Sequence, residues 1–329
     1  MSTTVAVSAA TRQRRAFRLH GLIWLVWRQH RAAFWTVLAV TAAGVAWIAR
    51  QRGQLISYLH QHGWPHTDMA SWATNFGPYE NPLSNASTVL GLLMPVLLGV
   101  FLGAPLIAGD LEHGTGRLIV SQTVSRSRWL VTKLGMTLLV VAVCATTLCT
   151  AFHWWWQPAG KASSPLYWLA GSTAGPLPVA LAVFTTAVGA ATGLLLRRVL
   201  LSMVVTFGLA VAVQYVWATS WPRLGTAVTA TTRTGVTDGA FPSLPEAAYD
   251  LDQSYLTGAG DTLDPSLCAL RDDRAISACL QQHDVVGWSV KYLPASQMTS
   301  LMWTASAILV ALTAVVTAYV LWWGNKRLY

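Results

Sequence analysis

The sequence has few charged residues, and this scarcity excludes an ordinary soluble domain. Aspartate, glutamate, lysine and arginine make up 11% of its 329 residues, and hydrophobic residues make up 53%, whereas a soluble domain carries about 25% charged residues. Acids are scarcer than bases, 13 against 22, which gives a net charge of +9. The bases lie beside apolar runs rather than on a polar face, so we expect membrane lipids, and no nucleic acid, as partners.

Motifs for nucleotide binding and for catalysis are also missing. No G-x-x-x-x-G-K-[ST] occurs, so the chain has no P-loop for ATP. No H-E-x-x-H, no G-x-S-x-G and no kinase signature occurs either. We therefore expect no enzyme activity and no cofactor on this chain. If it moves a substrate, the energy has to come from another subunit.

Cysteine is rare, with four in the chain. Cys144 and Cys149 lie in an apolar run, where a thiol behaves as a small apolar group. Cys268 and Cys279 lie in a long polar segment, without the spacing of a metal site. On an oxidising face a bridge between them would stabilise that segment by roughly 2–3 kcal/mol. The sequence predicts this disulfide and two free thiols.

Long apolar runs are what the sequence does contain. A helix needs about twenty apolar residues to cross the hydrocarbon core of a bilayer. Six runs reach or approach this length, and they predict an all-α, polytopic membrane protein with six transmembrane helices. The runs are 32–49, 88–108, 131–152, 176–196, 199–218 and 299–323.

The charges beside these runs predict the orientation. Positive residues are retained on the cytoplasmic side. Bases gather in the N-terminal segment, after the second run, between the fourth and fifth runs and at the C-terminus, whereas the acids other than Asp110 and Glu112 fall on the opposite side. Both termini are thus predicted to be cytoplasmic in a plasma-membrane protein, although Arg50 and Arg52 fall outside.

The runs divide the chain into four parts. Residues 1–31 form a cytoplasmic N-terminus with an interfacial helix, for which an extension of the first span is the alternative. Residues 32–218 hold spans one to five and a cytoplasmic loop at 109–133. Residues 219–298 form an extracellular subdomain, and 299–329 form the last span and the C-terminus. In the outer segment 51–87, Pro65, Pro78 and Pro82 argue against a long helix.

Small residues mark one face of the second span. Gly91, Pro95, Gly99 and Gly103 recur every fourth residue, which lets another helix approach closely. Tight packing within one subunit is favoured over a moving interface. Pro95 and Pro105 are candidates for kinks in this helix.

Only a few polar or aromatic residues in the spans are candidates for a ligand site. His153 and Gln214 are the polar groups that stand out there, with interfacial or interhelical hydrogen bonding favoured over a place on a transport path. Trp154, Trp155 and Trp156 are expected to mark a span end. A ligand-binding aromatic box is the alternative.

The loop after the second span holds the two remaining acids, Asp110 and Glu112. Gly114 and Gly116 allow a sharp turn, after which Leu118 to Val120 begin a short helix. Such a helix, with charges at both ends, is suited to receive force from a soluble partner. A solvated, positive loop is the alternative, and charge alone does not separate the two.

This loop resembles that of the permease subunits of ABC-2 type transporters. The residues that carry the resemblance are Glu112, Gly114, Thr115, Arg117, Leu118, Val124, Ser125, Arg126, Arg128, Trp129 and Lys133. The layout of the whole chain is similar as well. In that family the loop is a coupling helix that docks into a groove on a separate ATPase. The resemblance implies that the residues coupling this chain to an ATPase are Asp110, Glu112, Gly114, Thr115, Arg117, Leu118, Arg126 and Arg128.

The resemblance also implies the fold and the partners of a type V ABC exporter. Two permease copies would work with two ATPase copies, which would hold the ATP and magnesium. Spans without charges favour a hydrophobic or amphipathic cargo, such as a drug, lipid or peptide, passing at the permease interface along spans two and five. The alternative function is a membrane sensor or immunity subunit that binds a ligand through its extracellular segment and transports nothing.

Overall fold

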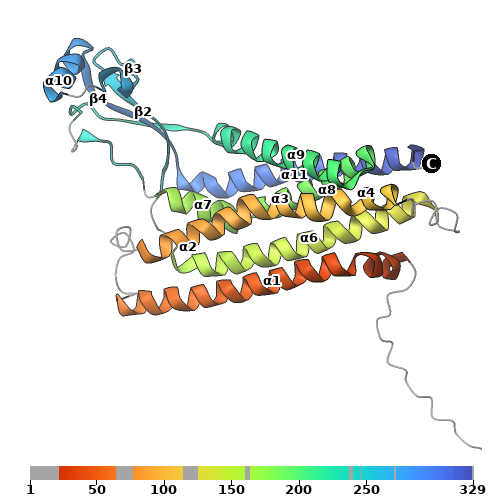
Figure 1. The fold of residues 1–329 in the computed structure, drawn as a ribbon. Coiled ribbons are helices and arrows are strands. Elements are labelled where there is room, and N and C mark those ends of the chain that lie inside the picture. The colour runs from red at the N-terminus through yellow and green to blue at the C-terminus, as the bar shows by residue number, and fades with distance from the viewer. Residues whose placement is uncertain are drawn as a thin grey trace, which may run out of the picture.

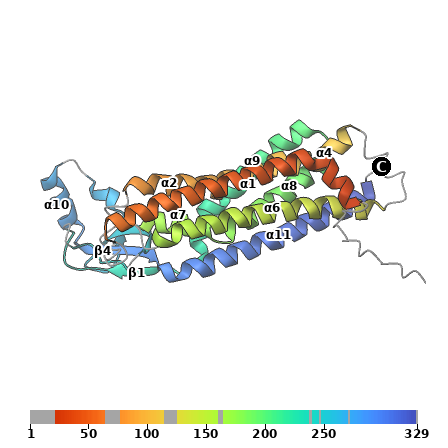
Figure 2. The same ribbon diagram turned by 90° about the horizontal axis from the view of Figure 1, so that it is seen from below.

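A bundle of long helices makes up most of the structure, a computed structural model that describes residues 22–63, 77–113, 125–159, 164–236, 240–245, 247–269 and 272–327. Within these ranges six helices are long and apolar enough to cross a membrane, which confirms the six predicted spans. They lie side by side, with a small sheet beyond one end (Figures 1 and 2). We call this end the sheet end, and the opposite end, where α8 turns into α9, the turn end.

The first span is α1 (Leu22–Gln61), a single helix of 40 residues. The predicted interfacial helix is therefore not a separate element from Leu22 onward, and residues 1–21 lie outside the described residues. Figure 2 shows the first turns of α1 bent away from the rest of the helix.

The second span changes its helical type along its length. It consists of α2 (Gly77–Thr88), the π-helical turn η2 (Val89–Leu93), α3 (Met94–Leu98), a second π-helical turn η3 (Gly99–Gly103) and α4 (Ala104–Glu112). Pro95 and Pro105 are the second residues of α3 and α4, the helices that follow the two π turns. A proline ring clashes with the carbonyl four residues earlier in a regular helix, and here that carbonyl lies in a wider turn. The prolines thus coincide with π turns.

The remaining spans are single helices. They are α6 (Arg126–Trp156), α8 (Leu177–Leu196), α9 (Val199–Ser220) and α11 (Met298–Arg327). The short helices η4 (Gln157–Ala159) and α7 (Ser164–Ala174) lie between α6 and α8, and η5 (Trp221–Leu224) and η8 (Ala295–Gln297) flank the sheet. Arg197 ends α8 with a left-handed backbone, φ 56°, and this permits the two-residue turn into α9.

The outer segment 51–87 is more helical than its prolines predict. It extends α1 to Gln61 and begins α2 at Gly77. Pro78 stands in the first turn of α2, where a helix has unpaired N–H groups in any case, and Pro82 forfeits one hydrogen bond, to that first turn. The expectation against a long helix is therefore wrong for Pro78 and Pro82, while Pro65 lies outside the described residues.

The sheet between α9 and α11 is antiparallel with the order β1-β4-β2-β3. Its strands are β1 (Val228–Thr231), β2 (Tyr249–Thr257), β3 (Thr262–Leu263) and β4 (Val285–Leu293), with η7 (Pro265–Cys268) and α10 (Asp273–Gln282) in the connection before β4. Cys268 and Cys279 form a disulfide with Cα atoms 5.8 Å apart, the pairing that the sequence predicts, and Cys144 and Cys149 are buried free thiols. The bridge ties η7 to α10.

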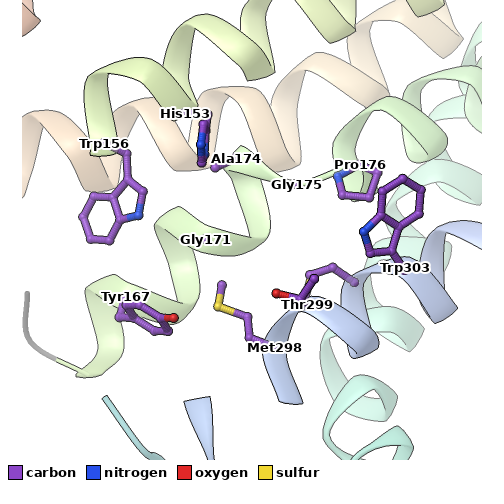
Figure 3. A pocket seen from close by; sticks show the side chains of 11 residues that line it. His153, Trp156, Tyr167, Gly171, Ala174, Gly175, Pro176, Met298, Thr299 and Trp303 are labelled. Atoms are coloured by element: carbon purple, nitrogen blue, oxygen red, sulfur yellow. The ribbon is translucent and has the colours of Figure 1, made fainter. Parts of the chain in front are cut away.

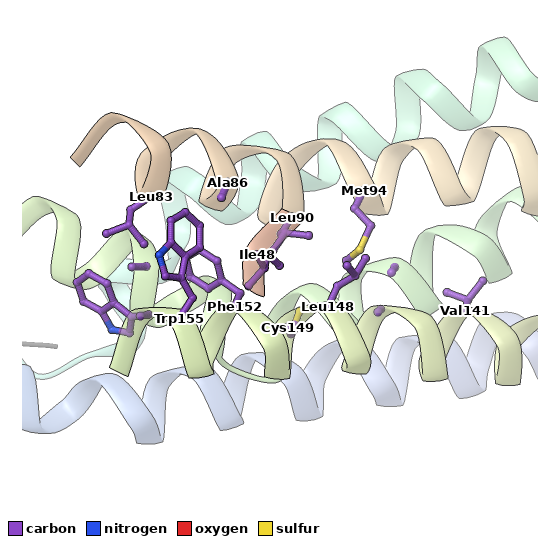
Figure 4. Packing of buried hydrophobic residues seen from close by; sticks show 14 of the residues in the cluster. Ile48, Leu83, Ala86, Leu90, Met94, Val141, Leu148, Cys149, Phe152 and Trp155 are labelled. Atoms are coloured by element: carbon purple, nitrogen blue, oxygen red, sulfur yellow. The ribbon is translucent and has the colours of Figure 1, made fainter. Parts of the chain in front are cut away.

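Large apolar side chains fill the bundle between α1, the second span and α6. Figure 4 shows Ile48, Leu90, Met94 and Phe152 meeting there. Trp155 and Phe152 are fully buried, so the sheet end of α6 is anchored inside the protein.

The small-residue face of the second span packs against α8. A Cβ atom on Gly103 would lie 2.5 Å from the backbone oxygen of Thr186, and one on Gly193 would lie 2.5 Å from that of Ala104. A Cβ atom on Gly99 would lie 2.9 Å from the backbone oxygen of Thr185, and Gly91 faces Thr173 of α7 at 3.3 Å. The close approach occurs within one chain, as the favoured interpretation states.

Candidate functional site

A buried ion pair joins the two ends of the predicted coupling loop. Asp110 lies in the last turns of α4 and Lys133 lies eight residues into α6. The Lys133 ammonium donates to the Asp110 carboxylate, and their side chains are 1% and 7% exposed. Charges inside a membrane-spanning bundle are costly unless they are paired. The pair therefore fixes the base of the loop, which leaves α4 after Asp110 and returns to α6 before Lys133.

A third helix reaches the same pair. Gln29 of α1 donates its Nε2 hydrogen to the Asp110 carboxylate at 2.5 Å. The Lys133 nitrogen lies 5.1 Å from the centre of the Trp129 ring, a cation–π contact. The buried polar atoms His30 Nε2 and Trp129 Nε1 have no hydrogen-bond partner among the described residues. We call Gln29, Asp110, Trp129 and Lys133 the polar cluster.

Glu112 makes a separate contact at the turn end. Its carboxylate accepts a hydrogen bond of 2.7 Å from the backbone N–H of Val199, the first residue of α9. A carboxylate is favoured at a helix N-terminus because the backbone dipole is positive there. The last turn of α4 is thus bonded to α1 and α6 through Asp110, and to α9 through Glu112.

The other predicted coupling residues divide into two groups. Arg128 is exposed near the start of α6, and Arg126 is the first residue of that helix, with only its backbone described. Gly114, Thr115, Arg117 and Leu118 lie outside the described residues. Among the described residues, the structure brings Asp110 and Glu112 to the same helix end, but each contacts a different neighbour.

Sequence reasoning missed the ion pair. The expectation that the spans hold almost no ionisable residue is wrong, because Asp110 and Lys133 lie within spanning helices and are buried. Asp110 was assigned to the loop on account of its charge, and Lys133 was assigned to the boundary between the loop and the third span. The available signal was an acid and a base at opposite ends of one loop, in a protein with few acids. Gln29 gave no signal, because nothing in the sequence places α1 beside Asp110.

The polar residues nearer the sheet end have ordinary partners or open surroundings. Gln214 donates to the backbone oxygen of Leu92 at 2.8 Å, the interhelical hydrogen bond that was favoured. His153 is exposed and lines a hollow of about 270 Å³. In Figure 3 this hollow lies between the end of α6, α7 and the start of α11, with Trp156 and Trp303 on opposite sides.

The three consecutive tryptophans do not form an aromatic box. Trp155 is buried in the core, Trp156 lines the hollow of His153, and Trp154 stacks under the Arg52 guanidinium at 4.0 Å. Arg52 also donates to the backbone oxygen of Trp154 at 3.1 Å. Arg52, one of the two arginines predicted to lie outside against the charge rule, is thus held by a neighbouring tryptophan.

Among the described residues no group of three metal-binding side chains comes together. In the segment that holds the sheet, the Ser266 side chain and backbone N–H bond to the Asp264 carboxylate and hold its pKa below the usual value. The bond from the backbone N–H is 2.8 Å long and closes the start of η7, so it has a structural role.

Comparison with known protein families gives a match. The family described as "ABC-2 membrane transporter related" matches residues 38–221, more than half of the chain. The match begins within α1 and ends after α9, so it contains Asp110, Glu112, Lys133 and Val199. No curated protein and no solved structure matches the chain.

Proposed function

Because this chain belongs to the ABC-2 membrane transporter related family, we propose that it is the permease subunit of an ATP-driven exporter. Two copies would associate with two copies of a separate ATPase, which binds ATP and magnesium. The loop between α4 and α6 would be the coupling segment that docks on the ATPase. The cargo would be a hydrophobic or amphipathic molecule, and the chemistry of hydrolysis would belong to the partner.

One observation carries this proposal: the last turn of α4 is bonded to three other spanning helices. Asp110 contacts Gln29 of α1 and Lys133 of α6, and Glu112 contacts the first residue of α9. A displacement of the loop therefore acts directly on spans one, two, three and five. Exposed surface loops do not usually require such ties, since their charges are solvated.

Replacing Glu112 tests the coupling role. Glu112→Ala removes one hydrogen bond at the start of α9 and is expected to cost about 0.5–2 kcal/mol of stability. The six spans should still insert, because their apolar surface is unchanged. The complex with the ATPase should hydrolyse ATP with reduced transport, or should dissociate more readily on size-exclusion chromatography. Asp261→Ala, which removes an exposed acid beside the sheet, is the matched control and should change neither.

A wild-type level of both complex formation and transport for Glu112→Ala would overturn the coupling role. The sensor function would then become the better explanation. Finding an ATPase that copurifies with the wild-type chain is the prior requirement for either result.

The orientation that we propose places the turn end in the cytoplasm and the sheet outside. Native thiols give little background, because Cys268 and Cys279 are bridged and Cys144 and Cys149 are buried. An impermeant maleimide should label Asp261→Cys in intact cells and should label Arg198→Cys only after the membrane is opened. Both positions are exposed. Labelling of Arg198→Cys in intact cells would reverse the orientation.

A further inference from the structure

Two adjoining hollows open near the sheet end, on the side of α7 that faces α8 and α9. Their volumes are about 290 Å³ and about 390 Å³. Both are lined by Leu169, Ser172, Leu177, Trp217 and Ala218. They therefore form one continuous groove, which we call the α7 groove. Of its described lining residues, it shares only Met302 with the hollow of His153. Ligand pockets commonly measure about 300–1,000 Å³, so the groove has the size of a ligand site.

The inner part of the groove holds a polar atom without a partner. Ser87 is 1% exposed and lines the groove, and its hydroxyl has no hydrogen-bond partner within the described part of the chain. Burying a hydroxyl without a hydrogen bond is unfavourable. Gln214 also lines this part, and its Nε2 is bonded to Leu92 while its carbonyl oxygen is not used in that bond. The inner part thus offers a hydroxyl donor and an amide acceptor.

The outer part of the groove is aromatic. Trp168, Trp221 and Tyr249 line it, and their ring centres lie 4.9–5.5 Å apart. Trp168 is held in place by a 2.9 Å hydrogen bond from its Nε1 to the backbone oxygen of Ala247. Tyr249 begins β2, so the sheet contributes to the mouth of the groove.

None of the described residues that line the α7 groove is charged. A ligand with a full charge would lose its hydration there without gaining an ion pair from them. Apolar surface, by contrast, is stabilised against leucine, tryptophan and tyrosine side chains.

We propose that the α7 groove binds an uncharged amphipathic molecule. Its hydroxyl or amide group hydrogen-bonds Ser87 and Gln214, and its apolar part lies along Leu169 and Trp217 toward the three aromatic rings. Where the molecule is the cargo, this deepens the proposed function by naming the class of substrate. The binding itself requires neither an ATPase nor transport.

The test uses the full chain, purified in lipid nanodiscs without an ATPase. The probe is a monoacylglycerol whose acyl chain carries a diazirine and an alkyne, and the matching fatty acid and fatty amine are its charged counterparts. The uncharged probe should label peptides from α7 and α9 in a saturable manner, and the charged probes should label them at least tenfold less. Equal labelling by all three would overturn the proposal.

Two variants locate the binding. Ser87→Ala should weaken probe binding about threefold to tenfold, the effect of one lost hydrogen bond. It should leave the melting temperature unchanged or raised, because it removes an unpaired buried hydroxyl. If Ser87 had only a structural role, the substitution would change the melting temperature and leave probe binding unchanged. Ala218→Trp fills the groove and should abolish labelling, whereas Ala212→Trp, on an exposed part of the same helix, should not.

Further measurements identify the molecule that occupies the α7 groove. A neutral lipid that copurifies with the wild-type chain and is lost in Ala218→Trp would indicate a resident lipid. Stimulation of the ATPase of the assembled complex by the probe, lost in the same variant, would indicate cargo. Either result supports the site. Disulfide-linked dimers of Ala218→Cys without any probe labelling would show that a second copy of the chain covers the groove, and would overturn it.

Discussion

Replacing Lys133 with methionine is expected to cost about 3–5 kcal/mol of stability, because it leaves the Asp110 carboxylate buried without its counter-ion. The side chains of the pair are 1% and 7% exposed, so water does not replace the lost partner. The Gln29 hydrogen bond, 2.5 Å from nitrogen to oxygen, comes from a neutral amide and does not supply the positive charge that is lost. Thermal unfolding of the chain in detergent, followed by tryptophan fluorescence, measures the loss.

The double variant Asp110→Asn/Lys133→Met should recover most of this stability. It removes both charges, and replacing a buried ion pair by neutral groups of similar size is often neutral or stabilising. The introduced asparagine side chain would still accept a hydrogen bond from Gln29. Lys291→Met is the matched control, because Lys291 pairs with Asp252 at 3.9 Å on the surface, with side chains 51% and 55% exposed. Exposed pairs contribute about 0–1 kcal/mol.

The same variants separate a structural clamp from a coupling element. If the double variant is stable and still couples hydrolysis to transport, the charges serve folding alone. If it is stable but uncoupled, the ion pair takes part in transmission. A single variant as stable as the wild type would show that the pair contributes nothing, and the polar cluster would lose its place as the candidate site.

The six spans could be predicted from the sequence because a helix that crosses a bilayer requires a long apolar run. The ends of the helices were harder to predict. Residues 50–61 are mostly polar, yet α1 continues through them to Gln61, because a helix satisfies its own backbone hydrogen bonds and because Leu55 and Leu59 of this segment are buried in the core. The sheet was not anticipated. Its strand β4 pairs with β1, about sixty residues earlier, and with β2, about forty residues earlier. Pairings over such distances leave no local pattern in the sequence.

The candidate site was half readable for a related reason. Glu112 was singled out as an acid on a basic surface, and its partner proved to be a backbone N–H of α9, a group that every sequence contains. Lys133 was placed at the start of a span because it is charged. In the structure, α6 begins before Lys133 and already buries Trp129 and Leu130. Contacts between helices depend on how the helices pack together in the bundle, and the local sequence pattern does not determine this.

Packing of the second span against α8 gives the second large effect. Gly103→Ala places a Cβ atom 2.5 Å from the backbone oxygen of Thr186 and 3.0 Å from its Cα atom. Backbone atoms cannot rotate away as the end of a side chain can, so the two helices have to separate. Overpacking of this kind costs about 1–3 kcal/mol, and more where backbone is displaced. We expect a loss at the upper end of this range, measured as the Lys133 variant is.

Glycines at open positions provide the control for Gly103→Ala. A Cβ atom on Gly135 of α6 or on Gly208 of α9 would meet no atom within 4 Å. Alanine there should stabilise the helix by up to about 1 kcal/mol through its higher helix propensity. The same substitution is thus expected to have opposite signs at Gly103 and at the two open positions. Equal effects at all three would mean that α8 does not approach the second span as closely as the structure shows.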